Sequence, residues 1–185
     1  MTYYTIRGIV GRSFPIILFT SVIGIFTGQI LNFEIENLVS MPIILILIPA
    51  LIKIGGDTGS MLGARLSSAL HMGLGGNIYR NPVVRNSVLA AFIVGMCAFT
   101  FLGIVVWITG IVLGIGVAFS TLMALCLISG FFELLAVYST TVAIAFASHR
   151  FGVDPDDTVI PIIATLGDLI GVIGIFSTMH LLNII

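Results

Sequence analysis

The sequence predicts an all-α integral membrane protein with five transmembrane helices. Of its 185 residues, 58% are hydrophobic and only 8% are Asp, Glu, Lys or Arg. Ordinary soluble domains contain about 25% charged residues. This chain therefore lacks the charged surface that a water-soluble enzyme, a disordered chain or a nucleic-acid-binding protein requires. Its 21 glycines suit helices that pack closely within lipid. We expect residues 1–185 to form one transmembrane domain in contact with the lipid bilayer.

The first two apolar segments are each long enough to cross a bilayer, which requires about 20 residues of helix. The first, residues 14–31, lies between Arg12 and the acidic residues Glu34 and Glu36. The second, residues 42–70, is interrupted in its middle by a stretch that contains Lys53, two glycines and Asp57.

The last three spans are separated by a short turn and a polar loop. The third covers residues 87–108 and ends at a turn near Thr109 and Gly110. The fourth, residues 111–148, exceeds the thickness of a bilayer, so we expect it to tilt or to project into water. The fifth covers residues 158–182 and follows the polar loop that begins at His149.

Basic residues indicate how the spans are oriented. Five spans place the two termini on opposite sides of the membrane. The N-terminal side holds six of the seven basic residues, and the loops of the other side hold none: Arg7, Arg12, Arg65, Arg80, Arg85 and Arg150. The positive-inside rule then predicts a cytoplasmic N-terminus and an extracellular C-terminus, in a multi-pass protein of the plasma membrane.

Three carboxylates lie within the predicted spans, at Asp57, Glu133 and Asp168. A charged side chain in the hydrocarbon region costs about 2.5–3.5 kcal/mol and usually faces a cavity or a partner. Asp168 lies about two helical turns after Pro161, near 10 Å along the axis. Pro161 frees backbone carbonyls one turn upstream, and Thr165 adds a hydroxyl on the same face. These oxygens suit a hard cation such as Mg²⁺ or Ca²⁺. The alternative is a buried Asp168 that is protonated or hydrogen-bonded to a neighbouring helix.

Asp57 and Glu133 each have two interpretations. Lys53 precedes Asp57 by four residues, so the two side chains can form an ion pair, or Asp57 can face the ion. Glu133 can guard the cytoplasmic part of an ion path, or it can hydrogen-bond to another helix. Beside Asp57 runs a stripe of small residues that lets another helix approach closely: Gly56, Ser60, Gly63 and Ser67.

The remaining polar residues carry weaker signals. Three acidic residues precede the fifth span, where they can cap its N-terminus or concentrate cations at the inner mouth of a path: Asp154, Asp156 and Asp157. The histidines and cysteines are scattered along the sequence, which gives little support to a transition-metal cage or a disulfide: His71, His149, His180, Cys97 and Cys126.

Residues 55–70 read GGDTGSMLGARLSSAL, and residues 154–171 contain DPDD, IP and TLGDLIG. Both segments resemble the MgtE magnesium channels, and the first is more similar still to the related eukaryotic solute-carrier magnesium transporters. The resemblance implies a homodimer with a cation path lined by the second and fifth spans of both copies. It also implies that Asp168 holds a hydrated Mg²⁺, that the backbone carbonyl of Ala164 contributes, and that Asp57 borders the path.

The chain departs from the MgtE pattern in two ways. Asp57 stands where MgtE proteins usually have Asn, which changes the charge of the site. Only about 13 residues precede the first span, so the cytoplasmic sensor domains of MgtE are not expected here.

The main hypothesis is Mg²⁺ transport through a homodimer, with five candidate residues at the ion site: Asp168, Asp57, Ala164, Thr165 and Glu133. Mn²⁺, Co²⁺ and Ca²⁺ are alternative ions. Exchange of Mg²⁺ against Na⁺ or H⁺ is an alternative mechanism, in which Asp57 or Glu133 carries the coupling ion.

Two other classes compete with transport. An intramembrane aspartyl protease uses two aspartates as acid and base, but its Gly-x-Gly-Asp motif needs Gly where this chain has Thr165. A structural membrane subunit is the remaining alternative, which is less favoured because three intramembrane carboxylates are costly to keep without a task. We expect a transporter and not an enzyme.

Overall fold

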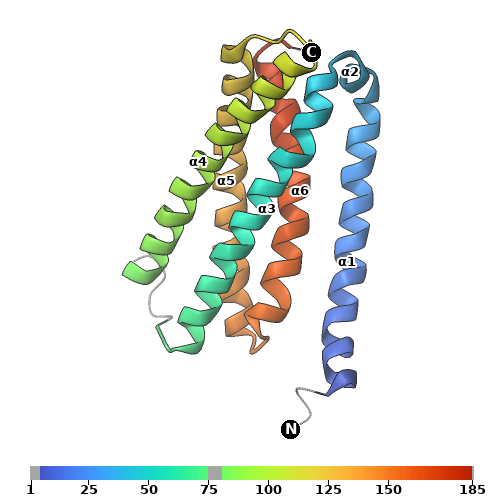
Figure 1. Cartoon of the computed structure of the whole chain (residues 1–185). Helices are drawn as coiled ribbons and strands as arrows, with labels where there is room; N and C mark the ends of the chain where they lie inside the picture. The colour runs from blue at the N-terminus through green and yellow to red at the C-terminus, as the bar shows by residue number, and fades with distance from the viewer. Residues whose placement is uncertain (1–4, 75–80, 185) are drawn as a thin grey trace.

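The computed structural model describes residues 5–74 and 81–184, which form a bundle of long helices (Figure 1). The helices of these residues are α1 (Ile6–Phe33), α2 (Ile35–Ser40), α3 (Pro42–His71), α4 (Pro82–Val112), α5 (Phe119–Arg150) and α6 (Pro155–Leu181). The start of α1 and the end of α6 lie at opposite ends of the bundle (Figure 1). That placement is what an odd number of spans requires.

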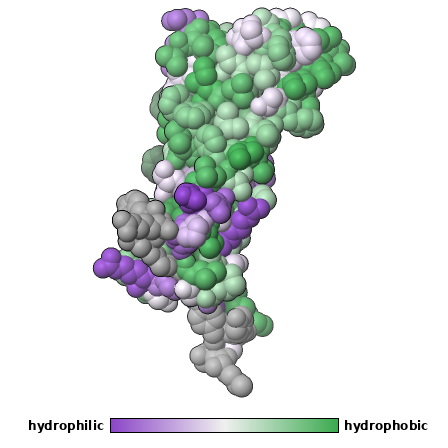
Figure 2. All heavy atoms as spheres, turned by 90° about the vertical axis from the view of Figure 1, so that its left-hand side faces the viewer, coloured by the Kyte–Doolittle hydropathy of each residue, from purple (hydrophilic) through white to green (hydrophobic). Residues whose placement is uncertain are grey.

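Five of these helices are long and apolar enough to cross a membrane, namely α1, α3, α4, α5 and the part of α6 from Thr158 to Leu181. The all-α class and the count of five spans are therefore confirmed. Figure 2 shows one face of the bundle, the α4 side, as mostly hydrophobic, with most of its hydrophilic residues toward the lower end, where α4 begins and α5 ends in Figure 1. The short helix α2, which joins α1 to α3, was not predicted.

Two expected boundaries are wrong. Thr109 and Gly110, expected to form a turn, lie within α4, and α5 begins at Phe119 instead of residue 111. The chain leaves α4 at Gly114, whose φ of +72° is a left-handed conformation that glycine adopts without strain. The next amide, that of Ile115, donates to the carbonyl of Gly110 at 2.8 Å and closes the helix end. Hydropathy could not locate this end, because apolar residues continue through it.

The helix α3 is continuous, although its polar middle was expected to interrupt it. Glycine weakens an isolated helix by about 1 kcal/mol per residue, but tertiary packing offsets that cost here. Gly55, Gly56, Gly59 and Gly63 are all buried, so each provides space for a neighbouring helix.

The central helix of the bundle is α6, which packs against α3, α5 and α1. Within the described residues, α1 contacts only α6 and α2, and Figure 1 shows it standing at one side of the bundle. Only 11% of its most apolar segment is buried, compared with 50% for α3. The largest fully buried side chains all belong to α3–α6: Ile43, Leu47, Leu51, Leu62, Leu66, Phe99, Leu122, Leu125, Leu134, Ile163, Ile175 and Met179.

Glycines bring α3 and α6 into direct backbone contact. A Cβ atom on Gly167 would lie 2.6 Å from the Cα of Gly56, and one on Gly63 would lie 2.6 Å from a methyl of Val159. The hydroxyl of Ser60 donates to the carbonyl of Ile160 at 3.4 Å. The small-residue stripe of α3 therefore does allow another helix to approach closely, as expected. In lipid this close packing replaces the hydrophobic effect as the force that joins helices.

Candidate cation site

Asp168 lies in the middle of α6 and is only partly buried. One turn earlier, Thr165 is also partly exposed, and its hydroxyl donates to the carbonyl of Pro161 at 3.1 Å. A hydroxyl that donates one hydrogen bond keeps its lone pairs, so Thr165 still offers an oxygen ligand. The side chains of Asp168 and Thr165 thus lie on the accessible part of α6.

The backbone carbonyl of Ala164 faces α3 at Gly56. A Cβ atom on Gly56 would lie 3.1 Å from this oxygen. Because Gly56 has no side chain, this oxygen packs against the backbone of α3 and not against a side chain. Carbonyl, hydroxyl and carboxylate oxygens are the ligands that Mg²⁺ and Ca²⁺ prefer, so residues 164–168 carry a suitable donor set along one segment of α6.

Asp57 is exposed on α3 and forms an ion pair with Lys53. The ammonium Nζ of Lys53 lies 2.6 Å from Oδ1 of Asp57, and the two side chains are 68% and 55% exposed. The structure thus contains the ion pair that was one of the two interpretations of Asp57. Both groups also interact electrostatically with Asp168 of α6. We call Lys53, Asp57, Thr165 and Asp168 the acidic face.

Glu133 is fully buried in α5, where its carboxyl lies between α3 and α6 and also interacts electrostatically with Asp168. Its Oε1 fills the space beside Gly55 of α3, because a Cβ atom on Gly55 would lie only 1.9 Å from it. The same oxygen also borders Gly171 of α6. Among the described residues, neither carboxylate oxygen has a hydrogen-bond partner. The structure therefore does not support the interpretation of Glu133 as a hydrogen-bonded interhelical carboxyl. An isolated buried carboxylate is very costly, so a proton, a bound cation or a buried water must satisfy this group.

The two glycines that surround Glu133 were not recognised as part of the site from the sequence. Gly55 and Gly171 lie on different helices and admit the carboxyl of a third, α5. The available signal was the spacing of Gly167 and Gly171, four residues apart on α6. Small residues at this spacing typify close helix contacts in membranes. The sequence could not show that the carboxyl of Glu133 fills the space between Gly55 and Gly171.

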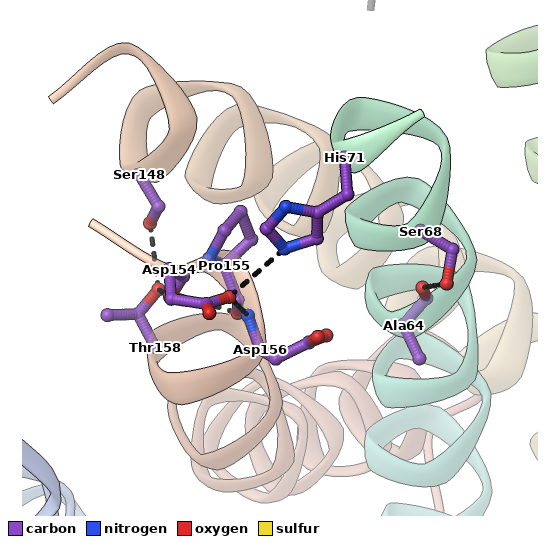
Figure 3. Close-up of polar contacts among 8 residues, drawn as sticks. All are labelled: Ala64, Ser68, His71, Ser148, Asp154, Pro155, Asp156 and Thr158. Atoms are coloured by element: carbon purple, nitrogen blue, oxygen red, sulfur yellow. Dashed lines mark hydrogen bonds and ion pairs between the residues drawn. The ribbon is translucent and has the colours of Figure 1, made fainter. Parts of the chain in front are cut away.

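A second polar cluster lies at the end of the bundle where α6 begins (Figure 3). Nε2 of His71 lies 3.3 Å from Oδ1 of Asp154, and one ligand atom each of His71, Asp154 and Asp156 lie within 4.8 Å of one another. The same carboxylate accepts from the amide of Asp156 at 3.0 Å, which confirms Asp154 as the N-cap of α6. His71 is thus less isolated than the scattered histidines suggested.

The family model for MgtE divalent cation transporters matches residues 48–178. The chain belongs to the MgtE family. The match covers more than half of the chain and includes Asp57, Glu133 and Asp168, while α1 lies outside it. No curated protein and no solved structure matches the chain.

Membership in the MgtE family decides between the function classes that the sequence left open. MgtE proteins are divalent cation transporters, which supports a transporter over an intramembrane protease. Together with the five membrane-spanning helices, it establishes a multi-pass membrane protein that carries a divalent cation. The acidic face joins the exposed charges of α3 to the partly exposed carboxylate of α6, within the region that the family model matches.

Proposed function

We propose that this chain transports Mg²⁺ across the plasma membrane along a path shared by two copies of itself, with Asp168 as the central ligand. The observation that carries the proposal is the position of Asp168. It is an accessible carboxylate in the middle of a spanning helix, beside the oxygens of Ala164 and Thr165. Mg²⁺ dehydrates reluctantly and is usually held through one or two carboxylates and its own waters, which matches this sparse donor set.

The need for a second copy follows from the exposure of the acidic face. Lys53 and Asp57 are more than half exposed within the membrane-spanning part of α3. Charges that face lipid are costly, so such groups usually line a bundle interior or a water-filled cavity. In one copy the described residues leave more than half of each side chain uncovered. A second copy placed against this face would enclose an aqueous path and bring two Asp168 side chains together, whose mutual repulsion a divalent ion relieves.

The orientation proposal rests on the positions of the basic residues. Three basic residues lie near helix ends: Arg65 near the end of α3, Arg85 near the start of α4 and Arg150 at the end of α5. These three helix ends form one end of the bundle (Figure 1). By the positive-inside rule this end is cytoplasmic. The cluster of His71, Asp154 and Asp156 then lies at the cytoplasmic entrance.

Flux into liposomes tests the transport proposal directly. We expect liposomes that contain the purified chain to take up Mg²⁺, read from an enclosed magnesium-sensitive dye, while empty liposomes do not. Competition by Mn²⁺, Co²⁺ and Ca²⁺ ranks the ions. Mg²⁺ flux that follows an imposed Na⁺ or proton gradient indicates exchange, and flux that ignores it indicates a channel. For proton exchange, Glu133, which has no hydrogen-bond partner among the described residues, offers a proton-carrying group. Protein that is folded but permits no divalent flux contradicts the proposal.

Cross-linking tests the shared path. In a chain with Cys97 and Cys126 replaced by Ser, we expect Thr165→Cys to form a disulfide-linked dimer on mild oxidation, because the two acidic faces oppose each other. Ile93→Cys is the matched control, since this exposed position lies on α4, which does not contact α6 within the described residues. Equal dimer yields from the two variants on denaturing gels would refute the arrangement.

A further inference from the structure

Lys53 is held at membrane depth by its own helix. It lies 11 residues after the start of α3 and 18 before its end, about 16 and 27 Å at 1.5 Å per residue. A lysine in such a place normally extends its chain toward the membrane surface. Here the chain runs along α3 instead, and the ammonium contacts Asp57 at 2.6 Å. The positive charge therefore stays within the membrane.

The ammonium also lies within electrostatic reach of the carboxylate on α6. Lys53 interacts with both Asp57 and Asp168, so its single positive charge offsets part of the negative charge of the acidic face. Its side chain remains 68% exposed, so the bundle does not enclose it and it is free to swing away. The ammonium is thus a cation placed among the groups that would hold a transported ion.

We propose that Lys53 is a tethered competitor for the transported cation, which occupies Asp57 until a divalent ion displaces it. The proposal rests on the proposed transport function and adds a determinant of ion selectivity to it. A monovalent ion brings the same charge as the ammonium but no tether, so it does not displace Lys53 from Asp57. A divalent ion has twice the Coulomb attraction to the carboxylates, so it does. The tether therefore favours divalent over monovalent ions and lowers the affinity for both.

Removal of the ammonium tests this role. Lys53→Met keeps the length and apolar part of the chain, so we expect Mn²⁺ to bind about fivefold more tightly, the upper range for an exposed ion pair. We also expect a Na⁺ leak in liposomes that the wild-type chain lacks. Lys53→Arg retains the charge, so its affinity should stay closer to that of the wild type. Arg65→Met is the matched control, because it removes an exposed positive charge of α3 that lies about three turns from Lys53.

Two measurements keep the outcomes distinct. Mn²⁺ binding to detergent-solubilised protein, followed by electron paramagnetic resonance, reports on Lys53 whether or not the chain transports. Unchanged Mn²⁺ affinity in Lys53→Met would overturn the competitor role and leave the transport proposal standing. Tighter Mn²⁺ binding in Lys53→Met together with absent flux in the wild type would support the competitor role and overturn the transport proposal. If Lys53→Met does not fold, Lys53→Gln is measured in its place. A purely structural ion pair predicts lower thermal stability with no gain in affinity.

Discussion

Replacing Asp168 with Asn is expected to reduce Mg²⁺ uptake at least about 30-fold, which corresponds to the 2 kcal/mol or more lost when one partner of a charged contact is removed. The amide has nearly the shape of the carboxylate, so the helix should form as before. It lacks the charge that attracts the ion and orients its waters. Because two copies share the path in our proposal, each dimer loses two negative charges at once.

The comparison requires a carboxylate that lies outside the acidic face. Glu36 is exposed on the short helix α2, so Glu36→Gln removes the same charge elsewhere and should leave uptake unchanged. Uptake is measured in liposomes with equal amounts of protein in each preparation. Normal uptake by Asp168→Asn would mean that the ion takes another route, and the proposed function would fail with it.

Replacing Gly167 with Ala is expected to have the largest effect on stability. The added methyl would lie 2.6 Å from the Cα and 2.7 Å from the backbone nitrogen of Gly56. Backbone atoms cannot rotate aside as a side chain can, so α3 and α6 must separate. Overpacking of this kind costs about 1–3 kcal/mol. We expect the unfolding midpoint of the detergent-solubilised protein to fall by several degrees, and uptake to fall with it, because Ala164 and Asp168 move away from α3.

Gly24→Ala is the matched control for Gly167→Ala, because it adds the same methyl group at an uncrowded position. This glycine lies in α1, and a Cβ there would have no described atom within 4 Å beyond its chain neighbours and the nearby backbone of its own helix. Alanine also favours helix by about 1 kcal/mol relative to glycine, so Gly24→Ala should unfold at the same or a higher temperature. A midpoint for Gly167→Ala equal to that of Gly24→Ala would show that α3 and α6 are farther apart than described.

The count of spans was predictable because bilayer thickness fixes how long an apolar helix must be. The close approach of a helix to α3 was also predictable from the stripe that contains Gly56 and Gly63, although the stripe alone does not say that the helix is α6. The ends of the helices were not predictable, because a helix end depends on a single backbone conformation such as that of Gly114. Apolar residues on both sides of that glycine gave hydropathy nothing to detect.

The orientation of side chains was harder to predict than the helices that carry them. Spacing places Val172 on the face of Asp168, one turn later, yet Val172 is fully buried. Four residues advance a helix by slightly more than one turn, which moves Val172 toward the core. The burial of Glu133 could not be predicted either. The helix α5 is apolar on most sides, so the sequence does not show its rotation, which depends on the glycines of two other helices.

The loose attachment of α1 bears on how the protein can be engineered. All of the largest fully buried side chains come from α3–α6, and α1 contributes only Thr20 and Thr27 to the buried residues. The four later helices thus supply most of the hydrophobic core, against which Ile30 and Leu31 of α1 also pack. The start of α1 lies far from that core, so it is a place to attach tags, reporters or fusion partners with little disturbance of the rest.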